Sequence, residues 1–444
     1  MYERRKPRTS APHSPGDPMG CTPAAPTPAD SCPDARLRIR RPRPPTMNHR
    51  DRFLELQALL TAHEALWRPP AFQADLPPWC AERPALTAAL LTLDEAVVDD
   101  LGHDPDASVR WLAPHLPALT RSTVLCALPP LPARELPERD PRFDAGVPGR
   151  KRAQIEAFAA HLPTAALPLL EWCAGKGHLG RRLALADGVP VRSLEIDPTL
   201  CADALRLAER SRAPQSVVCA DVLDPASRPH LRGHAVLALH ACGELHRSLV
   251  RSANRDGAPA YAIAPCCYHR GADGGYRPLG RDATLILDTA TLRLAVTETV
   301  TAPRHDRRRL ARDQAWKLGF IALRQTIAGA PGRSFRPVPP AWLNGGFEDF
   351  CRRLAEREDL RLPPAVDWAE WAAVGERRRD EVRRLELVRH AFRRALEVWL
   401  ALDLVLGFET RGFTARLGTF CERALTPRNL LILASRRGVG CVQP

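Results

Sequence analysis

Short apolar runs alternate with helical stretches along the middle of this 444-residue chain, and this alternation limits the folds that it can adopt. The runs lie at residues 166–172, 191–196, 216–220, 235–239, 260–264 and 284–287. Strands that are joined by helical crossovers pair in parallel. Two last runs, at 408–417 and 429–435, predict a hairpin-like return. We therefore predict an α/β fold with a doubly wound, mostly parallel sheet.

Other parts of the chain show different patterns. Residues 1–46 hold 11 of the 44 prolines and no apolar periodicity, so we expect disorder there. Met47 directly precedes the first helical pattern and is a possible true start of the protein. The predicted domains are a helical N-terminal domain, the first part of the sheet domain, a helical insertion and the closing strands, at residues 47–148, 149–340, 341–403 and 404–444.

Charge and composition narrow the environment and the partners. Lysine and arginine number 64 against 51 acidic residues, which gives a net charge of +13 and favours an acidic partner such as RNA or DNA. The longest apolar run, 398–408, is short and contains Asp403, so we predict no membrane span. The N-terminus lacks the apolar block of a secretory signal, so we expect a cytoplasmic protein whose thirteen cysteines are reduced.

A glycine-rich segment follows the first apolar run. Residues 171–180 read EWCAGKGHLG, in which Gly175, Gly177 and Gly180 match the pattern G-x-G-x-x-G. Glycines let a strand turn sharply into a helix whose first amide groups face a ligand. Glu195 comes twenty residues after Gly175, at the end of the next run, where an acidic side chain can hold a ribose. The spacing predicts a nucleotide-type ligand.

Two ligands suit such a turn, a nicotinamide dinucleotide and S-adenosylmethionine. Glu171 would repel a pyrophosphate but would suit the cationic amino-acid end of S-adenosylmethionine, which we therefore favour. Asp221 ends the third run and can accept from an adenine amino group, or cap a helix. Lys176 either neutralises the cofactor carboxylate or reaches solvent. Asp197 is a weaker ribose ligand and a good cap for a helix beginning near Pro198.

Four segments make the sequence resemble a known family. They read CAGKGH at 173–178, LHACGEL at 239–245, PCCYH at 265–269 and TPRN at 426–429. The acidic-x-x-x-Gly-x-Gly turn, the acidic end of the second run and Asp221 resemble the class I S-adenosylmethionine-dependent methyltransferases. More narrowly, the segments resemble the group that includes the acceptor-stem tRNA 2'-O-methyltransferases and the methyltransferase portion of the glutathione-S-transferase C-terminal-domain-containing protein.

The resemblance covers about residues 150–300 and 405–437 and implies a seven-stranded, Rossmann-like methyltransferase sheet. It also implies that Glu171, Gly175 and Gly177 surround the methionine and ribose moieties, that Glu195 holds the ribose hydroxyls and that Asp221 meets the adenine. The helical N-terminal domain and the insertion stay unexplained by it.

The methyl acceptor should approach the ends of the fourth and fifth runs, because ligands of parallel sheets bind at the carboxyl ends of the strands. His240 and His269 have a suitable pKa for a general base, and Tyr268 offers a hydroxyl or a stacking face. We favour His269 with Tyr268. The adenine-amino signature Asp/Asn-Pro-Pro-Tyr/Phe and the Lys-Asp-Lys-Glu tetrad are both missing, so neither mechanism can be borrowed.

Cysteines near the same strand ends suggest further chemistry. Cys242 with Cys266 and Cys267 resembles the two-cysteine layout of RNA cytosine-5 methyltransferases, in which a thiolate such as that of Cys267 adds to the base. Zinc binding by these thiols and His269 is an alternative. Adjacent cysteines rarely hold one ion and no Cys-x-x-Cys pair exists, so we predict no metal.

Two arginine clusters complete the sequence evidence. Arginines cluster at 307–312 and at 377–384 on predicted helices, and acidic residues interleave the second cluster. The first cluster could guide a phosphate backbone, whereas the second is typical of a solvated helix face. We predict a methyltransferase that modifies structured RNA, either tRNA or rRNA. A protein methyltransferase and a non-catalytic RNA-binding or scaffold protein that retains the cofactor fold are the alternatives.

Overall fold

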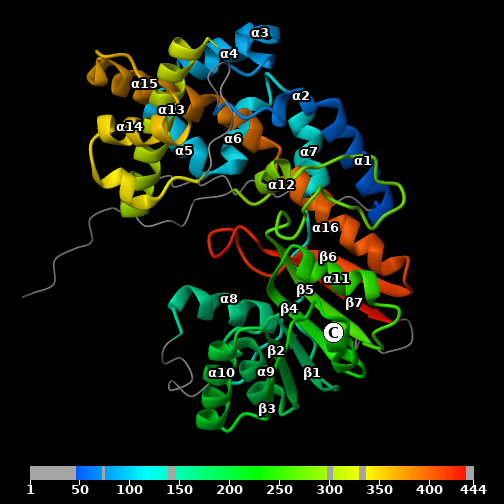
Figure 1. Ribbon diagram of the computed structural model, residues 1–444. Coiled ribbons are helices and arrows are strands. Elements are labelled where there is room, and N and C mark those ends of the chain that lie inside the picture. The colour runs from blue at the N-terminus through cyan, green and yellow to red at the C-terminus, as the bar shows by residue number, and fades with distance from the viewer. Residues whose placement is uncertain (1–46, 73–75, 139–146, 298–303, 330–336, 437–444) are drawn as a thin grey trace, which may run out of the picture. The chain divides into compact units, whose positions relative to one another are not determined.

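The computed structural model describes residues 47–72, 76–138, 147–297, 304–329 and 337–436 (Figure 1). We predicted that residues 1–46 are disordered and that Met47 is a possible true start of the protein. Residues 1–46 lie outside the described residues. No helix in the described ranges combines the length and the apolarity that a membrane crossing requires.

The N-terminal part of the described chain is helical. Its helices are α1 His49–Ala62, α2 Glu64–Trp67, α3 Trp79–Glu82, α4 Pro84–Leu91, α5 Glu95–His103, α6 Pro105–Leu112 and α7 Ala118–Cys126. Polar caps begin two of them: the Asn48 side chain accepts from the amide of Asp51, and the Asp104 side chain accepts from the amides of Asp106 and Ala107. Phe53 and Leu60 on α1 are fully buried, so this helix presents one apolar face to the rest of the protein.

One seven-stranded sheet forms the centre of the second part, as predicted. Its strands are β1 Leu169–Trp172, β2 Val191–Glu195, β3 Gln215–Cys219, β4 Ala235–Cys242, β5 Ala260–Cys266, β6 Phe413–Thr419 and β7 Leu430–Arg436. The strand order is β3-β2-β1-β4-β5-β7-β6, in which β7 alone runs antiparallel to both of its neighbours. Strands β6 and β7 form the predicted return. The α/β prediction, a mostly parallel Rossmann-like sheet, is confirmed.

The predicted strand at 284–287 is wrong. These residues have no strand assignment and lie in an irregular segment that ends at α12 Thr289–Leu294. The amide of Thr284 donates to the side chain of Gln57 at 2.8 Å, so its backbone is satisfied by a side chain from α1 rather than by a neighbouring strand. Its apolar residues Leu285 and Leu287 are buried all the same. The short apolar run at 284–287 therefore indicates the burial of its leucines and not the pairing of a strand.

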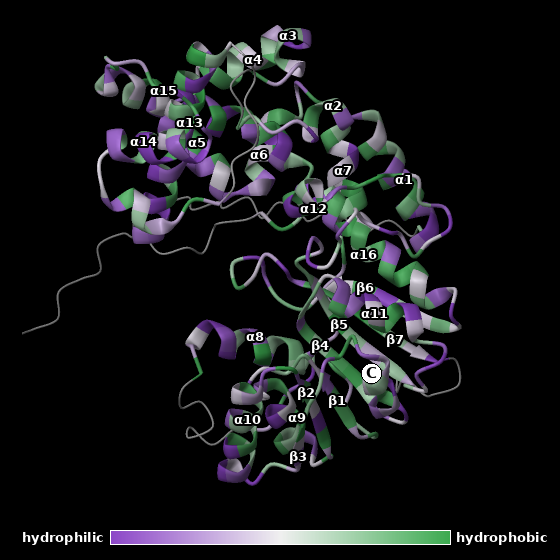
Figure 2. Ribbon diagram, in the orientation of Figure 1, coloured by the Kyte–Doolittle hydropathy of each residue, from purple (hydrophilic) through white to green (hydrophobic). Residues whose placement is uncertain are grey.

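Helices cover both faces of the sheet. Helices α8 Gly149–Ala160, α9 His178–Asp187 and α10 Pro198–Ser211 lie on one face, where Ile155, Phe158 and Leu183 pack with Leu237 of β4. The other face is covered by η2 Pro225–Leu231, α11 Glu244–Ser252 and α16 Arg393–Glu409. Figure 2 shows hydrophobic residues along the central strands, which fits strands that are buried on both sides.

A helical region joins β5 to β6 and starts before residue 341. It contains α12, α13 Arg304–Ala328, η3 Pro340–Asn344, α14 Phe347–Arg357, α15 Trp368–Ala391 and α16. Helix α15 packs against α13, α4, α5 and α6, and α16 packs against α1 and β6. The N-terminal helices and this region thus share one apolar core, which contains Phe53 stacked on Trp399 with ring centroids 5.0 Å apart.

A buried carboxylate connects α16 to the segment before α12. Asp403 is fully buried and accepts from the Tyr276 hydroxyl at 2.7 Å and from the amides of Leu279 and Gly280 at 2.9 and 2.7 Å. Burial raises the pKa of the Asp403 carboxyl. The residue that interrupts the longest apolar run of the sequence therefore satisfies three polar groups inside the core.

Replacing this carboxylate should destabilise the fold strongly. We expect Asp403→Ala to lower the free energy of unfolding by about 3 kcal/mol, because it leaves a buried hydroxyl and two amides without an acceptor. Urea denaturation followed by circular dichroism measures the change. Asp100→Ala on α5 is the control, since Asp100 is exposed. Equal losses in the two variants would contradict this role of Asp403.

Candidate functional site

The strand order changes direction between β1 and β4. From β1 the chain proceeds outward to β2 and β3, then returns to the other side of β1 with β4 and β5. The crossovers on the two sides leave in opposite directions, and ligands of open α/β sheets bind at the carboxyl ends of the strands beside such a point. Residues that follow these ends are the first candidates for a site.

The loop after β1 is tied to the end of β2. The amide of Ala174 donates to the carbonyl of Leu194 at 2.9 Å, and the amide of Gly175 donates to Oε2 of Glu195 at 2.8 Å. Gly175 and Gly177 have φ angles of +57° and +63°, which favour glycine. A Cβ on Gly175 would meet no atom within 4 Å, whereas one on Gly177 would lie 2.6 Å from Nε2 of Gln215. The loop thus has a packed side and an open side.

Glu195 holds three backbone amides at once. Besides Gly175, its Oε1 accepts from the amides of Ile196 and Asp197 at 3.0 and 3.1 Å. The side chain of Asp197 accepts from the amides of Thr199 and Leu200, so Asp197 caps α10 as the alternative prediction had it. Glu195 therefore fixes the position of the glycine loop relative to β2.

Glu171 lies in the interior of the fold. Its carboxylate is 5% exposed, and Oε2 accepts from the Ser193 hydroxyl at 2.8 Å. A Cβ on Gly180 would come within 2.6 Å of the same oxygen, so the carboxylate lies tightly between β1 and α9. Burial raises the pKa of Glu171 to about 7, against the opposing effects of Ser193, the Gly180 amide and Arg181. Glu171 is therefore buried and hydrogen-bonded within the fold, and its contact with a cofactor stays a prediction.

Lys176 and Asp221 differ in whether their charged groups already have an ionic partner within the protein. Nζ of Lys176 lies 2.9 Å from Asp203 of α10 in a partly exposed ion pair. Asp221 is exposed after β3, and its Oδ1 accepts from the amide of Leu223 at 2.9 Å. Its carboxylate stays accessible to a ligand at the same edge of the sheet.

The three residues that we predicted to face the methyl acceptor differ in how deeply they are buried. His240 is exposed at the end of β4, with Nε2 3.0 Å from Oε1 of Gln154 on α8. His269 is half-buried, and burial lowers its pKa while the neighbouring Cys267 opposes this effect. Tyr268 is fully buried, with its ring edge-on to His246 at 5.7 Å. The structure contradicts the predicted contact of Tyr268 with a substrate, since neither its hydroxyl nor its ring reaches the surface.

Three cysteines converge where β4 and β5 end. The Sγ atoms of Cys242 and Cys266 are 3.5 Å apart, and those of Cys242, Cys266 and Cys267 all lie within 4.8 Å of one another. Hydrogen bonds from the other two thiols lower the pKa of Cys267 to about 2, and the charges of Arg428 and His269 add to this effect. Burial raises the pKa of Cys173 at the end of β1, and Glu195, Cys242 and Asp221 add to this effect. The ends of four strands thus lie close enough to interact.

Backbone strain gathers at the same place. Five non-glycine residues in the described ranges have positive φ angles, and three of them are Cys173, His240 and Cys267, which follow or end β1, β4 and β5. A left-handed conformation is unfavourable for such residues and persists where the surroundings impose it. Concentrated strain at the carboxyl ends of adjacent strands is typical of a functional site.

Opposite charges occupy the two halves of this edge. Glu195 and Asp221 follow β2 and β3, on the side of the glycine loop. Four basic residues act electrostatically on the histidines and cysteines that follow β4 and β5. They are Lys151 and Arg428 near His240, Arg428 near Cys267, and Arg293 and Arg270 near His269. Carboxylates thus follow β2 and β3 and basic side chains act on the residues after β4 and β5, while Lys151 also acts on Glu171 and Lys176 lies in the glycine loop.

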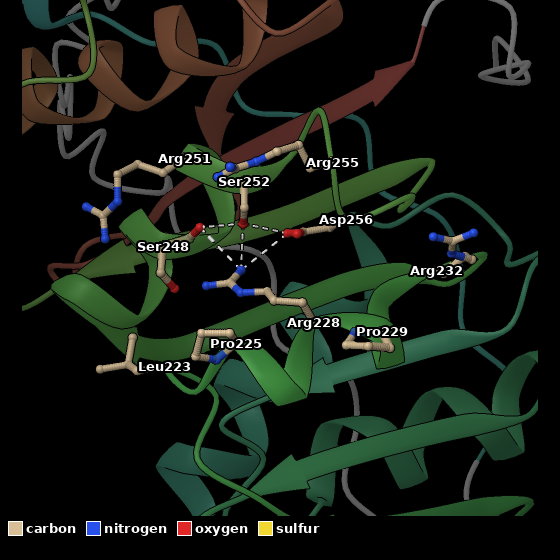
Figure 3. Close-up of a pocket in the computed structure, with 10 residues that line it drawn as sticks. All are labelled: Leu223, Pro225, Arg228, Pro229, Arg232, Ser248, Arg251, Ser252, Arg255 and Asp256. Atoms are coloured by element: carbon tan, nitrogen blue, oxygen red, sulfur yellow. Dashed lines mark hydrogen bonds and ion pairs between the residues drawn. The ribbon is translucent and has the colours of Figure 1, made fainter.

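A cavity of about 570 Å³ lies elsewhere, between η2 and α11 (Figure 3). Arg228 points into its centre and donates to the Ser252 hydroxyl at 2.6 Å and to Asp256 at 3.2 Å. The same guanidinium lies over the ring of Trp172 at 5.4 Å. None of the lining residues is a predicted site residue, and the central arginine is satisfied within the fold.

Sequence reasoning missed several residues that shape the site. Gln215 donates to the carbonyl of Gly177 at 2.9 Å and to the Ser193 hydroxyl at 2.8 Å, and so links β3, β2 and the start of α9. Gln154 contacts His240 from α8. Ser193 carried little signal, because Arg192 and Glu195 are polar residues of the same strand. Gln154 and Gln215 carried none, because each contacts a residue far away in the sequence.

Comparison with known proteins agrees with this site. Residues 150–272 match the family model described as "Methyltransferase domain". The match covers α8 to β5 and includes the glycine loop, Glu195, Asp221 and the three cysteines, but not β6 and β7. The comparison with curated proteins gives no match. This part of the chain is thus supported as a methyltransferase domain.

The buried position of Glu171 predicts a pH dependence of stability. Its folded pKa of about 7 lies above the ordinary value of 4.5, so the folded state binds the proton more tightly. Stability that Glu171 contributes is present below pH 4.5 and is lost as the pH rises to about 7, by at most about 1.4 kcal/mol per pH unit. We expect Glu171→Gln to flatten the slope of the free energy of unfolding against pH. Urea denaturation between about pH 5 and pH 8 measures this slope.

The control for this prediction is Glu209→Gln. Glu209 is an exposed residue of α10, and its replacement should leave the slope as in the wild type. A wild-type slope that Glu171→Gln does not change would show that the carboxyl is charged and well solvated in the folded protein.

Proposed function

We propose that the protein is an S-adenosylmethionine-dependent methyltransferase. The observation that carries the proposal is the glycine loop held by Glu195 at the reversal of strand order, inside a segment that matches a methyltransferase-domain model. Proteins with methyltransferase domains generally use this cofactor. The buried Glu171 no longer discriminates between S-adenosylmethionine and a dinucleotide, so a binding experiment has to make that distinction.

The residues at this edge fit such a cofactor. The open side of the loop at Gly175 leaves space for a ligand, and the amides that begin α9 can receive a carboxylate. Glu195 and Asp221 are the acceptors for ribose hydroxyls and an adenine amino group. Once bound, the cofactor supplies an electrophilic methyl group. The protein has then to align the acceptor and remove a proton where the acceptor carries one.

Structured RNA is the acceptor that we favour. Lys151, Arg270 and Arg293 are exposed around the ends of β4 and β5, where an acceptor would have to approach the methyl group. Phosphates are attracted to such a basic rim irrespective of sequence. The resemblance to tRNA methyltransferases points the same way, and tRNA or rRNA is the class that we would test first. A protein substrate, and a scaffold without turnover, are the alternative outcomes.

The second arginine cluster is a weaker argument for RNA. Arg377, Arg378 and Arg379 pair with acidic residues of α15, and Arg383 pairs with Glu95 and Asp99 of α5. These charges are compensated within the protein, in agreement with a helix-face role. In the first cluster Arg307, Arg308 and Arg309 are exposed on α13, although Arg309 pairs with Asp306 and Arg307 contacts His103. We therefore place the proposed phosphate contacts at the basic rim and on α13.

His240 and His269 are the proposed general bases. Gln154 accepts from the Nε2 proton of His240, which leaves Nδ1 of this exposed ring as the basic atom. Nδ1 of His269 is buried and has no hydrogen-bond partner in the described residues. Either ring could take a proton from an acceptor hydroxyl or amine. Catalysis by the Cys267 thiolate stays a prediction.

Blocking the open side of the glycine loop should abolish cofactor binding without a special loss of stability. Gly175 and Gly188 both have positive φ angles, of +57° and +66°, and a Cβ on either would meet no atom within 4 Å. We expect Gly175→Val and Gly188→Val to lower the melting temperature similarly. Isothermal titration calorimetry with S-adenosylmethionine should detect binding only in Gly188→Val and the wild type.

Two outcomes would contradict the cofactor proposal. One is equal S-adenosylmethionine affinity in the two glycine variants, which would place the ligand elsewhere. The other is binding of a nicotinamide dinucleotide, and not of S-adenosylmethionine, to the wild-type protein.

Removing charges from the basic rim should weaken RNA binding. We expect Lys151→Ala and Arg293→Ala each to reduce the slope of log affinity against log salt by about 0.9, the value for one lost phosphate contact with a duplex. Fluorescence anisotropy with a labelled tRNA transcript measures the slope. Arg352→Ala on α14 is the control, because Arg352 is exposed and pairs with Glu348 away from the strand ends.

Labelled methyl transfer separates the acceptor classes. Incubation with radiolabelled S-adenosylmethionine and total RNA should label RNA, and the label should fall in Lys151→Ala and Arg293→Ala. Labelling of total protein instead would replace RNA by a protein substrate. Cofactor binding without transfer to either would favour the scaffold alternative.

A further inference from the structure

Three thiols meet at one point of the fold outside the proposed cofactor contacts. Cys242 ends β4, Cys266 ends β5 and Cys267 follows it. Their Sγ atoms lie within 4.8 Å of one another, with 3.5 Å between Cys242 and Cys266. Within the described part of the chain, no other three histidine, cysteine or acidic side chains come together in this way. The ten described cysteines are all free, so none of these thiols is lost to a disulfide.

Backbone geometry brings the three thiols together. The pairing of β4 with β5 shifts between Leu239 and Cys242, and this irregularity places Cys242 opposite Cys266. Neighbouring residues of a regular strand point to opposite faces, which would separate Cys266 from Cys267. Cys267 has a φ angle of +45°, so the chain leaves the strand conformation there and its thiol turns toward the other two. This turn removes the objection to adjacent cysteines that the sequence raised.

The turns that carry the thiols are locked to each other. The amide of Gly243 donates to the carbonyl of Cys266 at 3.0 Å, and that of Glu244 donates to the carbonyl of Arg270 at 2.9 Å. The amide of Arg270 in turn donates to the carbonyl of Cys267 at 2.9 Å. A Cβ on Gly243 would lie 2.1 Å from the Arg270 carbonyl oxygen, which shows how closely the two turns pack. The thiols are therefore held by a rigid frame, as a metal site requires.

The spacing of the sulfur atoms suits a tetrahedral ion. Zinc–sulfur bonds of about 2.3 Å in tetrahedral geometry separate sulfur atoms by about 3.8 Å. The 3.5 Å between the sulfur atoms of Cys242 and Cys266 and the limit of 4.8 Å for all three pairs bracket that value. A disulfide would use only two of the three sulfurs and would require them to approach to about 2 Å. Thiolate ligands favour zinc over oxygen-preferring cations such as magnesium or calcium.

We propose that Cys242, Cys266 and Cys267 bind one Zn²⁺ ion. Zinc binds thiolates, so each of these thiols that still carries a proton releases it to solvent when it binds. These three ligands leave a fourth position to a water molecule or another group, which is the arrangement of zinc sites that are open to a substrate. The ion would then lie beside the strand ends at which we place the methyl acceptor. The zinc proposal does not depend on the proposed function, since it concerns binding alone.

Zinc content tests the proposal. Elemental analysis of the full-length protein, purified with a reducing agent and without chelator, should find about one zinc per chain. We expect Cys242→Ser and Cys267→Ser to lose most of it, because a serine hydroxyl is a poor zinc ligand. Cys126→Ser on α7 is the matched control, since Cys126 is a half-buried thiol away from the cluster, and it should retain the metal.

A second measurement uses only the wild-type protein, in case the serine variants do not fold. Alkylation followed by mass spectrometry should find Cys242 and Cys267 protected, and treatment with a zinc chelator should expose them. Cys219 is exposed and should react equally in both samples. Substitution by Co²⁺ should add a sulfur-to-metal charge-transfer band in the near ultraviolet.

Two results would overturn the zinc site. One is a wild-type protein without zinc whose affinity for added Zn²⁺, measured against a chromophoric chelator, equals that of the triple Cys→Ser variant. The other is alkylation that the chelator does not change. Neither readout involves methyl transfer, so failure here leaves the proposed methyltransferase function untouched, and failure of that function leaves the zinc site untouched.

Discussion

The hydrogen bonds of the Glu195 carboxylate hold the centre of this structure together. One oxygen accepts from Gly175 in the loop after β1, and the other accepts from two amides that lead into α10. Buried backbone amides require partners, and here one side chain satisfies three of them. The loop after β1, the end of β2 and the start of α10 therefore keep fixed positions. Because β1 borders the reversal of strand order, this connection also shapes the crevice in which a ligand would bind.

The positions of charged side chains along the sheet edge suggest from which sides the cofactor and the methyl acceptor approach. Carboxylates follow the strands on the side of the glycine loop, and basic side chains surround the ends of β4 and β5. A nucleoside with a cationic sulfur and a polyanionic acceptor would then approach from different sides. The three cysteines lie at the ends of β4 and β5, where a bound metal ion would affect the acceptor more than the cofactor.

Periodicity and glycine spacing predicted the parts of this fold that depend on local sequence. The seven observed strands, the return of β6 and β7, the turn at Gly175 and Gly177 and the cap at Asp197 all follow from patterns a few residues long. The run at 284–287 failed because its leucines are buried in an irregular segment whose Thr284 amide is satisfied by Gln57 of α1 and not by a strand neighbour. Helix α13 begins well before residue 341, where the insertion was predicted to start, although its arginines at 307–312 were expected on a helix.

Side-chain roles were harder to predict because they depend on contacts between distant segments. Electrostatic reasoning placed Glu171 opposite a cofactor, but Ser193 and the closely packed Gly180 hold it beneath α9. Tyr268 follows a strand end, yet it is completely buried in the apolar core that the sheet shares with the helices. The thiol cluster depends on a left-handed turn at Cys267 that no residue preference indicates. Pairings of this kind become visible only when the strands are placed side by side.

A crystal structure with S-adenosylhomocysteine tests the central claim most directly. We predict that the nucleoside lies at the carboxyl ends of β1–β3, with its ribose at Glu195, its adenine near Asp221 and its sulfur directed toward the ends of β4 and β5. A ligand bound in the cavity around Arg228, or a crevice that stays empty at saturating ligand concentration, would contradict the account.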